Sequence, residues 1–533
     1  MQKLLLLGDE AISQGAIDGG ISGFYAYPGT PSTEIMEYAQ HSKEVKASGI
    51  NCVWSANEKT AMESAIGMSY VGKRAMVQLK HVGLNVAADA FINSTITGVN
   101  GGLIVVAADD PSMHSSQNEQ DSRFYGDFAM IPILEPSNQQ EAYDMAQNGF
   151  ELSEKYNVPI LVRITTRLAH SRAGVSTGNK IAQNPISLPK DPRQFVLLPG
   201  IARKNYKKLL EMQEAMQEAS NNSIYNKYID GVDKSIGIVA CGISYNYLME
   251  NFDGKCPHPV VKISQYPIPE NHLRKLRNEC QSILVLEEGY PLVEKNLKGF
   301  FNEGLQIRGR LDGSLPRDGE LNPNLVAKAL GLEIIEGEAI PEIVKMRPPS
   351  LCMGCGHRDV YNALNEALED YDIGRVFADI GCYTLGALPP FNAINSCVDM
   401  GASITMAIGA SDAGLVPAVA VIGDSTFTHS GMTGLLDAVI KDAPIVVLIS
   451  DNSTTGMTGG QASAAKGRIV DICKGIGVNP AHIRILNPLK RLHEENLAIL
   501  KEELAYKGLS VVVAQRECIQ TAIRNKKAAK KTK

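Results

Sequence analysis

The chain has 533 residues, a formal net charge of −6, 44% hydrophobic residues and 21% charged residues. This composition is typical of a globular protein of about three domains, at roughly 150 residues each. The slightly acidic balance gives no general electrostatic reason to bind nucleic acid or an anionic membrane. The four leucines at 4–7 are too short a run for a signal peptide or a bilayer span. We therefore expect a cytoplasmic protein whose ten cysteines are reduced thiols or metal ligands.

Residues 1–170 alternate between strand and helix patterns, which predicts an α/β domain with a mainly parallel sheet. A short buried strand at 4–7 precedes an amphipathic helix. A second strand leads through the turn YPGTP into a helix that Ser32 or Thr33 would cap. Further strands are predicted at 52–57, 74–80, 102–110 and 158–165, with Glu58 after the first of them.

Four further regions complete the predicted organisation. Residues 171–231 are predicted to be a linker with one amphipathic helix, at 204–220, lying on the surface. Residues 232–340 predict a second α/β domain without a Gly-rich phosphate loop, and residues 347–522 a third. The basic tail at 523–533 is expected to be disordered or solvated. The predicted fold class is therefore α/β, with three consecutive doubly wound, mainly parallel-sheet domains.

The segment 417–461 predicts strand, helix, strand. The apolar runs AVAVI and IVVLI are each followed by small polar residues, and the helix between them, MTGLLDAVIK, has its apolar residues at helical spacing. Leu435, Leu436, Val439 and Ile440 fall on one apolar stripe of this helix.

Two polar residues follow these strands, Asp424 and Asn452. In neighbouring strands ~5 Å apart they would emerge side by side at the carboxyl edge of the sheet, where α/β proteins bind ligands. Their oxygens suit Mg²⁺ held together with phosphates. The sequence Gly423-Asp424-Ser425, followed by Asn452, resembles the motif of thiamine diphosphate enzymes, with Ser425 where glycine is usual.

The cysteines offer a second candidate site. Cys352 and Cys355 form a CxxC, and Cys382 follows in GCYTLG. From the spacing alone, this CxxC could be a redox pair, a zinc site, part of an iron–sulfur cluster or without function. A cluster needs four thiolates and accepts distant ones. Cys518 is the best fourth candidate, and Cys397 and Cys473 are the runners-up.

The motifs CMGCGHR, GCYTLG, GDSTFTHSG and DNSTTGMTGGQ closely resemble the 2-oxoacid:ferredoxin oxidoreductases, and most closely the large (alpha) subunits that act on indolepyruvate. YPGTPSTEI, WSANEKTAMESAIG, KHVGLNVAAD and HSSQNEQDSR agree with the same subunits. The resemblance covers residues 1–520, and its motifs stand in the same order. It implies the thiamine diphosphate-binding fold: a pyrimidine-binding type domain at 1–170, a transketolase C-terminal-like domain at 232–340 and a diphosphate- and magnesium-binding domain at 347–522.

The implied activity is oxidative decarboxylation of aryl pyruvates to aryl-acetyl-CoA. The implied cofactors are thiamine diphosphate, Mg²⁺ and a 4Fe–4S cluster, with CoA as co-substrate. Electrons would pass to ferredoxin or a separate electron-carrier protein, and a smaller second subunit would complete a hetero-oligomer.

The resemblance also implies roles for particular residues. Asp424 and Asn452, with a backbone carbonyl near Thr454, would ligate Mg²⁺. Glu58 would hydrogen-bond the aminopyrimidine ring of the cofactor, with Glu63 as the weaker alternative. Without the resemblance, Glu58 is an acidic residue favoured by a helix dipole. The remaining implied residues are Gly423, Ser425 and His357 at the cofactor, and Cys352, Cys355, Cys382 and Cys518 at the cluster.

For the 2-oxoacid, the resemblance points to Thr30, Ser115 and Arg123. The Arg123 guanidinium is a planar fork that matches a carboxylate, although these polar residues could equally be loop caps.

One departure concerns electron transfer. The ferredoxin-like domain with cysteine-rich motifs that is usual in this family has no counterpart in residues 1–533, so we expect a separate small protein or another acceptor to take the electrons. Two other hypotheses stay open: a non-oxidative thiamine diphosphate-dependent decarboxylase or carboligase, and a non-catalytic assembly subunit.

Overall fold

The computed structural model describes residues 3–189, 194–299, 305–335, 337, 339–345, 349–397 and 399–531. The chain forms two compact units, Met1–Glu338 and Ala339–Lys533. None of the helices in the described ranges combines the length and hydropathy that a bilayer span requires.

The first unit contains a seven-stranded sheet in the order β12-β6-β7-β5-β4-β2-β3. Its strands are β2 (Gly23–Ala26), β3 (Asn51–Trp54), β4 (Ala75–Lys80), β5 (Leu103–Asp109), β6 (Ile133–Leu134), β7 (Ile160–Thr165) and β12 (Gln265–Tyr266). All neighbours are parallel except β12, which runs antiparallel to β6. The predicted parallel α/β sheet is confirmed, and the short β6 and β12 are additions to it.

Helices cover both faces of this sheet. Helices α1 (Gly8–Asp18), α2 (Thr33–His41) and α7 (Gln139–Tyr156) pack into one apolar core, and α4 (Glu58–Tyr70) and α5 (His81–Thr97) pack into another. The short helices α3 (Lys43–Ala47), α6 (Arg123–Ala129) and α8 (Thr166–His170) complete this part. Ser32 precedes α2, but its hydroxyl donates to the carbonyl of Gly29 at 2.8 Å and does not cap the helix.

The N-terminal strand differs from the prediction. β1 (Lys3–Leu7) pairs with β8 (Arg172–Ser176) in a separate two-stranded antiparallel sheet, and Leu5 is 66% exposed. The predicted buried strand at 4–7 was therefore wrong in its burial, because an apolar run alone does not reveal whether a strand enters the central sheet.

A second sheet in the same unit has the order β14-β13-β10-β11-β9. Its strands are β9 (Lys227–Ile229), β10 (Ile236–Cys241), β11 (Val260–Ile263), β13 (Ser282–Leu286) and β14 (Gln306–Arg308), and only β9 is antiparallel to its neighbour. The helices beside it are α11 (Ser244–Glu250), α12 (Glu270–Glu279), α13 (Leu292–Lys298) and α14 (Pro323–Leu330).

The predicted linker belongs to the first unit's packing. Two helices replace the single predicted one, α9 (Pro199–Glu211) and α10 (Gln213–Asn221). Leu209 and Met216 are each 1% exposed and join the core that contains α4, α5 and α12. The segment is therefore partly a core element, and only its outer face is the expected surface connector.

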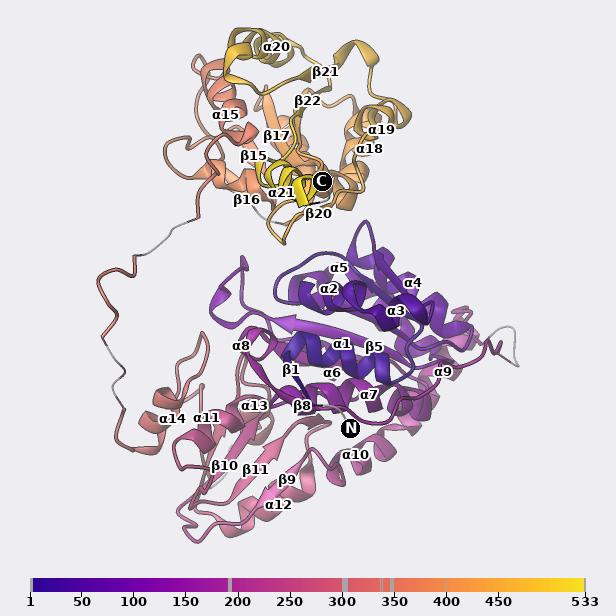
Figure 1. Cartoon of the computed structure of the whole chain (residues 1–533), viewed down its shortest axis with the longest axis vertical. Coiled ribbons are helices and arrows are strands. Elements are labelled where there is room, and N and C mark those ends of the chain that lie inside the picture. Colours follow the sequence, from indigo (N-terminus) through magenta and orange to yellow (C-terminus); the bar gives the residue numbers. More distant parts are fainter. Residues whose placement is uncertain are drawn as a thin grey trace. The chain divides into compact units, whose positions relative to one another are not determined.

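The second unit is a doubly wound, all-parallel sheet in the order β16-β15-β17-β18-β22-β21. Its strands are β15 (Val376–Ala378), β16 (Ser396–Cys397), β17 (Ala418–Gly423), β18 (Ile445–Asp451), β21 (Ile483–Leu486) and β22 (Ser510–Gln515). Helices α15 (Gly356–Ala367) and α20 (His493–Ala505) pack on one face, and α16 (Ala402–Asp412), α18 (Met432–Lys441) and α19 (Ile469–Ile476) on the other (Figure 1).

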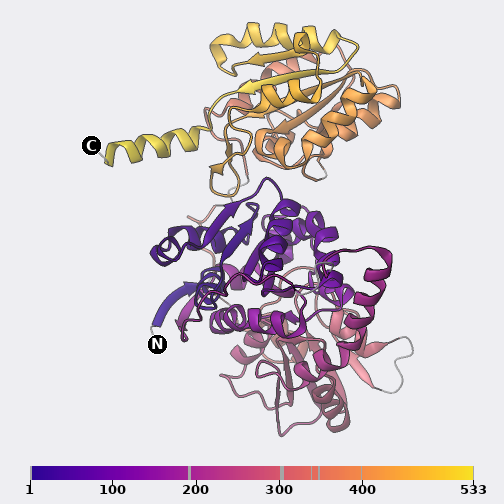
Figure 2. The same ribbon diagram turned by 90° about the vertical axis from the view of Figure 1, so that its right-hand side faces the viewer.

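Two details of this unit refine the predictions. Of the predicted apolar stripe of α18, Leu435 is fully buried, whereas Leu436 is 45% and Ile440 76% exposed, so only part of the stripe faces the core. The C-terminal residues form helix α21 (Ile519–Lys531), which projects from the rest of its unit (Figure 2). The basic tail is thus helical as far as Lys531, consistent with the helix propensity of alanine and lysine, and its residues 523–527 are exposed, as expected of a solvated end. Residues 532–533 of the predicted tail lie outside the described residues.

Candidate functional site

Asp424 lies at the carboxyl edge of the second unit's sheet. β17 and β18 are parallel neighbours with Gly423 opposite Ser450, so Asp424 and Asn452 leave the sheet at the same edge. The Asp424 side chain is 2% exposed, and burial raises the pKa of its carboxyl to about 7. Among the described residues its Oδ2 atom has no hydrogen-bond partner. A buried carboxylate with a free oxygen fits a metal cation, because burial without a counter-charge is unfavourable.

The loop after β18 forms the opposite side of this position. The backbone N–H of Thr454 donates to Oδ1 of Asn452 at 3.1 Å, and the Thr454 hydroxyl donates to the carbonyl of Gln461 at 2.8 Å. These bonds hold the hairpin of β19 (Thr454–Thr455) and β20 (Gln461–Ala462). Ser425 departs from the common motif, and its hydroxyl oxygen lies 2.9 Å from the hydroxyl oxygen of Thr455. It therefore connects the two loops.

Gly423 is required by an aromatic neighbour. A Cβ atom at this position would lie 2.6 Å from the ring of Tyr383, which is closer than carbon atoms approach. Tyr383 follows Cys382 in a short 3-10 helix (Cys382–Ala387), and its hydroxyl donates to Asp379. The motifs GCYTLG and GDS thus pack directly against each other.

Four cysteines line one cavity of about 110 Å³ at this edge: Cys352, Cys355, Cys382 and Cys518. Asn452 lines the same cavity. Among the described residues, no three of these sulfur atoms lie within 4.8 Å of one another, so the thiols are not gathered around a single ion. The spread and the number of thiols fit a multi-iron cluster.

The two runners-up for a fourth cysteine lie elsewhere. Cys473 is fully buried in the apolar core on the α18 face, and Cys397 directs its thiol to the carbonyl of Asp379 at 3.6 Å. Neither lines the cavity of the four cysteines. The fold brings the CxxC together with the sequence-distant Cys518. Spacing alone had left this grouping open.

The environment of the cavity disfavours free thiolates. Burial, reinforced by repulsion from the neighbouring cysteines, raises the pKa of Cys355, and the same causes together with Asp424 raise that of Cys382 to about 12. Burial lowers the pKa of His357 to about 4, so this imidazole is neutral, with Nδ1 3.5 Å from Cys355 Sγ. Thiols of this kind are inert unless metal ions deprotonate them.

Glu58 belongs to the first unit and begins α4. Asn57 caps the helix by accepting from the Thr60 N–H at 2.9 Å, and Glu58 itself is 6% exposed. A Cβ atom at Gly83, in the first turn of α5, would lie 2.7 Å from the Glu58 carboxylate. The acidic residue is thus held in a close-fitting buried position and not on a solvated helix end. Glu63 pairs with Lys59 on the exposed side of the same helix.

Thr30 and Ser115 meet in neighbouring loops, where the Ser115 hydroxyl donates to the Thr30 carbonyl at 3.3 Å. Lys80, at the end of β4, donates to the Ser115 carbonyl at 2.6 Å. Burial lowers the pKa of Lys80 to about 8, against the opposing effect of Asp110. The prediction from sequence missed Lys80, although its position at the carboxyl end of a parallel strand was a usable signal.

Arg123 is enclosed by protein groups, which argues against its predicted role as the substrate's carboxylate partner. The side chain is fully buried. Its guanidinium donates to Asp121, to the Tyr266 hydroxyl at 3.2 Å and to the Tyr290 carbonyl at 2.9 Å, and pairs with Glu287 at 3.0 Å. These partners occupy its donors, so Arg123 is a structural ion-pair residue.

A groove of about 1130 Å³ in the first unit is lined by residues of α10, α12 and α13. None of the predicted site residues lines it. Its volume alone is therefore no argument for chemistry there.

Comparison with known families agrees with this geometry. Residues 14–222 match the thiamine diphosphate-binding domain of pyruvate flavodoxin/ferredoxin oxidoreductases, and residues 379–514 match the C-terminal TPP-binding domain of thiamine pyrophosphate enzymes. A solved 2-oxoglutarate:ferredoxin oxidoreductase from Magnetococcus marinus shares the fold, with a TM-score of 0.50 and 16% identity over 62% of this chain and 65% of that one. The matched domains define a thiamine diphosphate-dependent oxidoreductase of 2-oxoacids.

Full-length relatives make the assignment more specific. "Indolepyruvate oxidoreductase subunit IorA" of Archaeoglobus fulgidus and that of Pyrococcus abyssi are each 38% identical over 97% of this chain and 86% of their own length. The 2-oxoglutarate synthase subunit KorA of Methanothermobacter thermautotrophicus is 30% identical over 34% of this chain and 49% of its own. The chain belongs to the indolepyruvate oxidoreductase alpha-subunit (IorA) family.

Proposed function

We propose that this subunit carries the thiamine diphosphate site for oxidative decarboxylation of aryl pyruvates to aryl-acetyl-CoA, with electrons passed through iron–sulfur to ferredoxin or a similar carrier. The observation that carries the proposal is the meeting of four cysteines and the buried, partly unpartnered Asp424 at one sheet edge. A decarboxylase without electron transfer has no use for the four thiols.

Asp424, Asn452 and the backbone at Thr454 would hold Mg²⁺ on the cofactor diphosphate. Thiamine diphosphate, when bound, supplies the electron sink that makes loss of carbon dioxide from a 2-oxoacid possible. Asp424 supports this assignment with a free oxygen in a site closed to solvent. Ser425 and Gly423 shape the turn, through the Thr455 hydroxyl and the Tyr383 ring respectively.

Cys352, Cys355, Cys382 and Cys518 would hold a 4Fe–4S cluster. The repulsion from Asp424 that helps raise the pKa of Cys382 places this thiol in the electrostatic range of the metal position. A cluster there would lie close to the reacting centre, as rapid electron removal requires. His357 supports the assignment as a neutral residue beside Cys355, where it adds no charge.

Glu58 would act on the aminopyrimidine ring of the cofactor, as a buried carboxylate held against Gly83. On the substrate side, we replace Arg123 by Lys80, which lies with Thr30 and Ser115 at the ends of parallel strands. A lysine ammonium would pair with the 2-oxoacid carboxylate, leaving the aryl group to apolar surroundings.

The relatives are named as oxidoreductase subunits, which supports a hetero-oligomer. We take its second subunit to be the smaller one. We propose that this partner, CoA and an electron carrier complete the enzyme in the cytoplasm. The test is anaerobic co-expression with the partner subunit, followed by a 2-oxoacid panel with viologen dye as electron acceptor. Indolepyruvate and phenylpyruvate should reduce the dye in a CoA-dependent reaction. Carbon dioxide release without dye reduction would refute oxidation.

Cysteine variants test the cluster with a matched control. Cys518→Ser should lose iron and dye reduction while thiamine diphosphate still binds. Cys397→Ser, which alters a thiol outside the cavity, should retain both. Full iron content in Cys518→Ser would remove this residue from the ligand set.

A further inference from the structure

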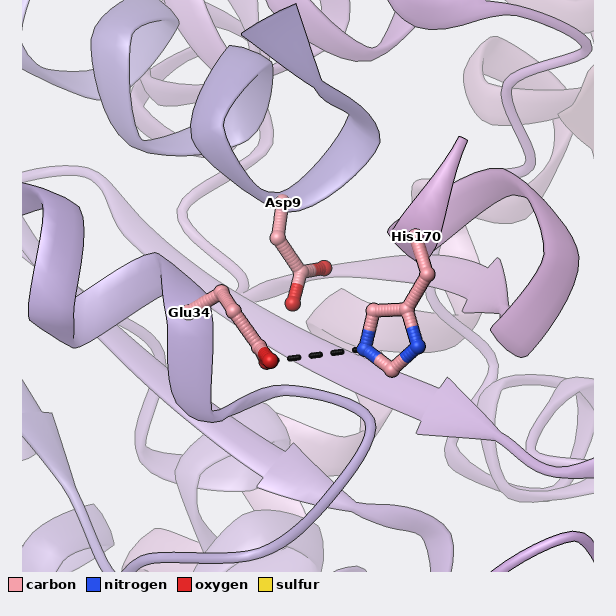
Figure 3. Close-up of side chains that lie close together, drawn as sticks. All are labelled: Asp9, Glu34 and His170. Atoms are coloured by element: carbon pink, nitrogen blue, oxygen red, sulfur yellow. Dashed lines mark ion pairs between the residues drawn. The ribbon is translucent and has the colours of Figure 1, made fainter. Parts of the chain in front are cut away.

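Three side chains with metal-binding groups meet in the first unit, and none of the three has a role in the sites described above. Asp9 lies in the first turn of α1, Glu34 in the first turn of α2, and His170 ends α8. One potential ligand atom of each lies within 4.8 Å of the others (Figure 3). Within the described part of the chain, this is the one group of three or more such atoms at that spacing.

Asp9 is the unusual member of the group. Its side chain is fully buried, and neither carboxylate oxygen has a hydrogen-bond partner among the described residues. Burial, and then the charges of Glu34 and Glu10, raise the pKa of this carboxyl well above its usual value. Buried carboxyl groups in folded proteins are ordinarily hydrogen-bonded or paired, because an isolated one is costly. The described residues therefore supply no hydrogen-bond partner for the Asp9 carboxyl group.

Glu34 and His170 give this position access to solvent. Their side chains are 35–36% exposed, and the imidazole Nε2 lies 3.5 Å from the Glu34 carboxylate. The pairing with Glu34 raises the pKa of His170. Figure 3 shows Asp9 and the imidazole both directed toward the space beside Glu34. An ion could enter from this side and reach the buried carboxylate.

The backbone explains why the three elements meet. A Cβ atom at Gly8 would lie 2.3 Å from the carbonyl of Leu168, so only glycine lets α8 approach the start of α1 this closely. This contact places His170 beside Asp9. The Ser32 hydroxyl bond to Gly29 fixes the turn before α2 and therefore the position of Glu34.

We propose that Asp9, Glu34 and His170 form a binding site for a divalent first-row metal ion. Two carboxylates and one imidazole match the ligand preferences of Mn²⁺ and Zn²⁺, with water completing the coordination shell. The ion would neutralise the buried Asp9 and join α1, α2 and α8. It would hold the loop 27–33 at the start of α2, and it is independent of the thiamine diphosphate and cysteine sites.

The test is a Mn²⁺ titration of the full chain, stripped with chelator and without thiamine diphosphate, followed by electron paramagnetic resonance. We expect one tightly bound Mn²⁺ per chain that Zn²⁺ displaces. Asp9→Asn and His170→Ala should each weaken binding at least tenfold. His41→Ala, on α2 but outside the group, and Asp424→Asn should leave it unchanged.

Thermal unfolding supplies a second readout. Mn²⁺ should raise the Tm of the first unit in the unaltered chain and in His41→Ala, but not in Asp9→Asn. The alternative is that Asp9 is a neutral carboxylic acid with no metal. In that case Mn²⁺ would show no saturable binding and Asp9→Asn would be as stable as the unaltered chain or more so. That result, or equal Mn²⁺ affinity in all variants, would overturn the proposal.

Discussion

At the residue scale, Gly83 matters through the space that it leaves to a neighbour. A Cβ atom there would lie 2.7 Å from the Glu58 carboxylate and 2.8 Å from its Cγ. The atoms that must move belong to a side chain and not to the backbone. A substitution at Gly83 should therefore move the Glu58 carboxylate with little effect on the stability of the fold.

Gly83→Ala should reduce dye-linked oxidation of 2-oxoacids by tenfold or more, because it displaces the Glu58 carboxylate. Tenfold corresponds to about 1.4 kcal/mol of transition-state free energy. The Tm should change little. Gly67→Ala, in α4 with open space around the new methyl group, is the control and should keep full activity. A Gly83→Ala enzyme with unaltered rate would argue against a role for Glu58.

Lys80 predicts a pH dependence. Burial lowers the pKa of its ammonium to about 8, so the group loses its charge as pH rises through 8. The KM for the 2-oxoacid should therefore rise above pH 8, while kcat changes less. The Lys80→Arg side chain stays charged over this range, so the KM of that variant should not rise above pH 8. A KM in the unaltered enzyme that stays flat from pH 7 to 9 would contradict the assignment.

Candidate residues could be recognised in the sequence where a local motif marks them, and not where a network of distant residues decides their surroundings. Asp424 and the CxxC pair were candidates from a strand end and a short spacing, whereas spacing left the fourth cysteine open. The structure places Asp424 at the sheet edge and the four cysteines in one cavity there. Arg123 looked equally suitable in sequence. Its burial depends on Glu287 and Tyr266, more than 140 residues away, and no local pattern reports them.

At the element scale, the β17–α18–β18 unit was predicted nearly to its boundaries, but the buried face of α18 was not. Apolar residues surround too much of this helix for their spacing to select one face. A π-helical turn at Phe427–Gly431 also precedes α18 and changes the rotation per residue there. Leu435 and Leu436 are neighbours roughly 100° apart around the helix, so Leu435 lies in the core while Leu436 is 45% exposed.

This difference can be measured by a pair of neighbouring substitutions. Leu435→Ala should lower the free energy of unfolding of the second unit by about 2–5 kcal/mol, because it leaves a cavity in a packed core. Leu436→Ala should change it by less than about 0.5 kcal/mol, as exposed positions do. Chemical denaturation followed by circular dichroism provides the measurement. Equal losses in both variants would place both side chains in the core.

At the scale of the whole molecule, a buried ion network joins the two sheets of the first unit. Arg163 on β7 donates to Asp109 at 2.7 Å and pairs with Glu135. Arg123 pairs with Glu287, which follows β13 of the second sheet. The network explains why two sheets with separate strand orders form one compact unit.

Arg123→Met should lower the stability of the first unit by about 3–5 kcal/mol, because it leaves buried carboxylates without their counter-charge. The unfolding transition of the second unit should not move. Any enzyme that still folds should show a nearly unaltered KM for the 2-oxoacid. A specific rise in KM at normal stability would restore Arg123 as a substrate residue.

Strand β12 decides where this protein can be divided. It comes from the region of the second sheet, yet it pairs with β6 at the border of the first sheet. A fragment that stops near residue 231 would expose the backbone of β6, and unpaired strand borders promote aggregation. No strand ladder among the described residues crosses between residues 338 and 339. Splitting the gene between residues 338 and 339 should therefore be tolerated, whereas splitting it near residue 231 should fail.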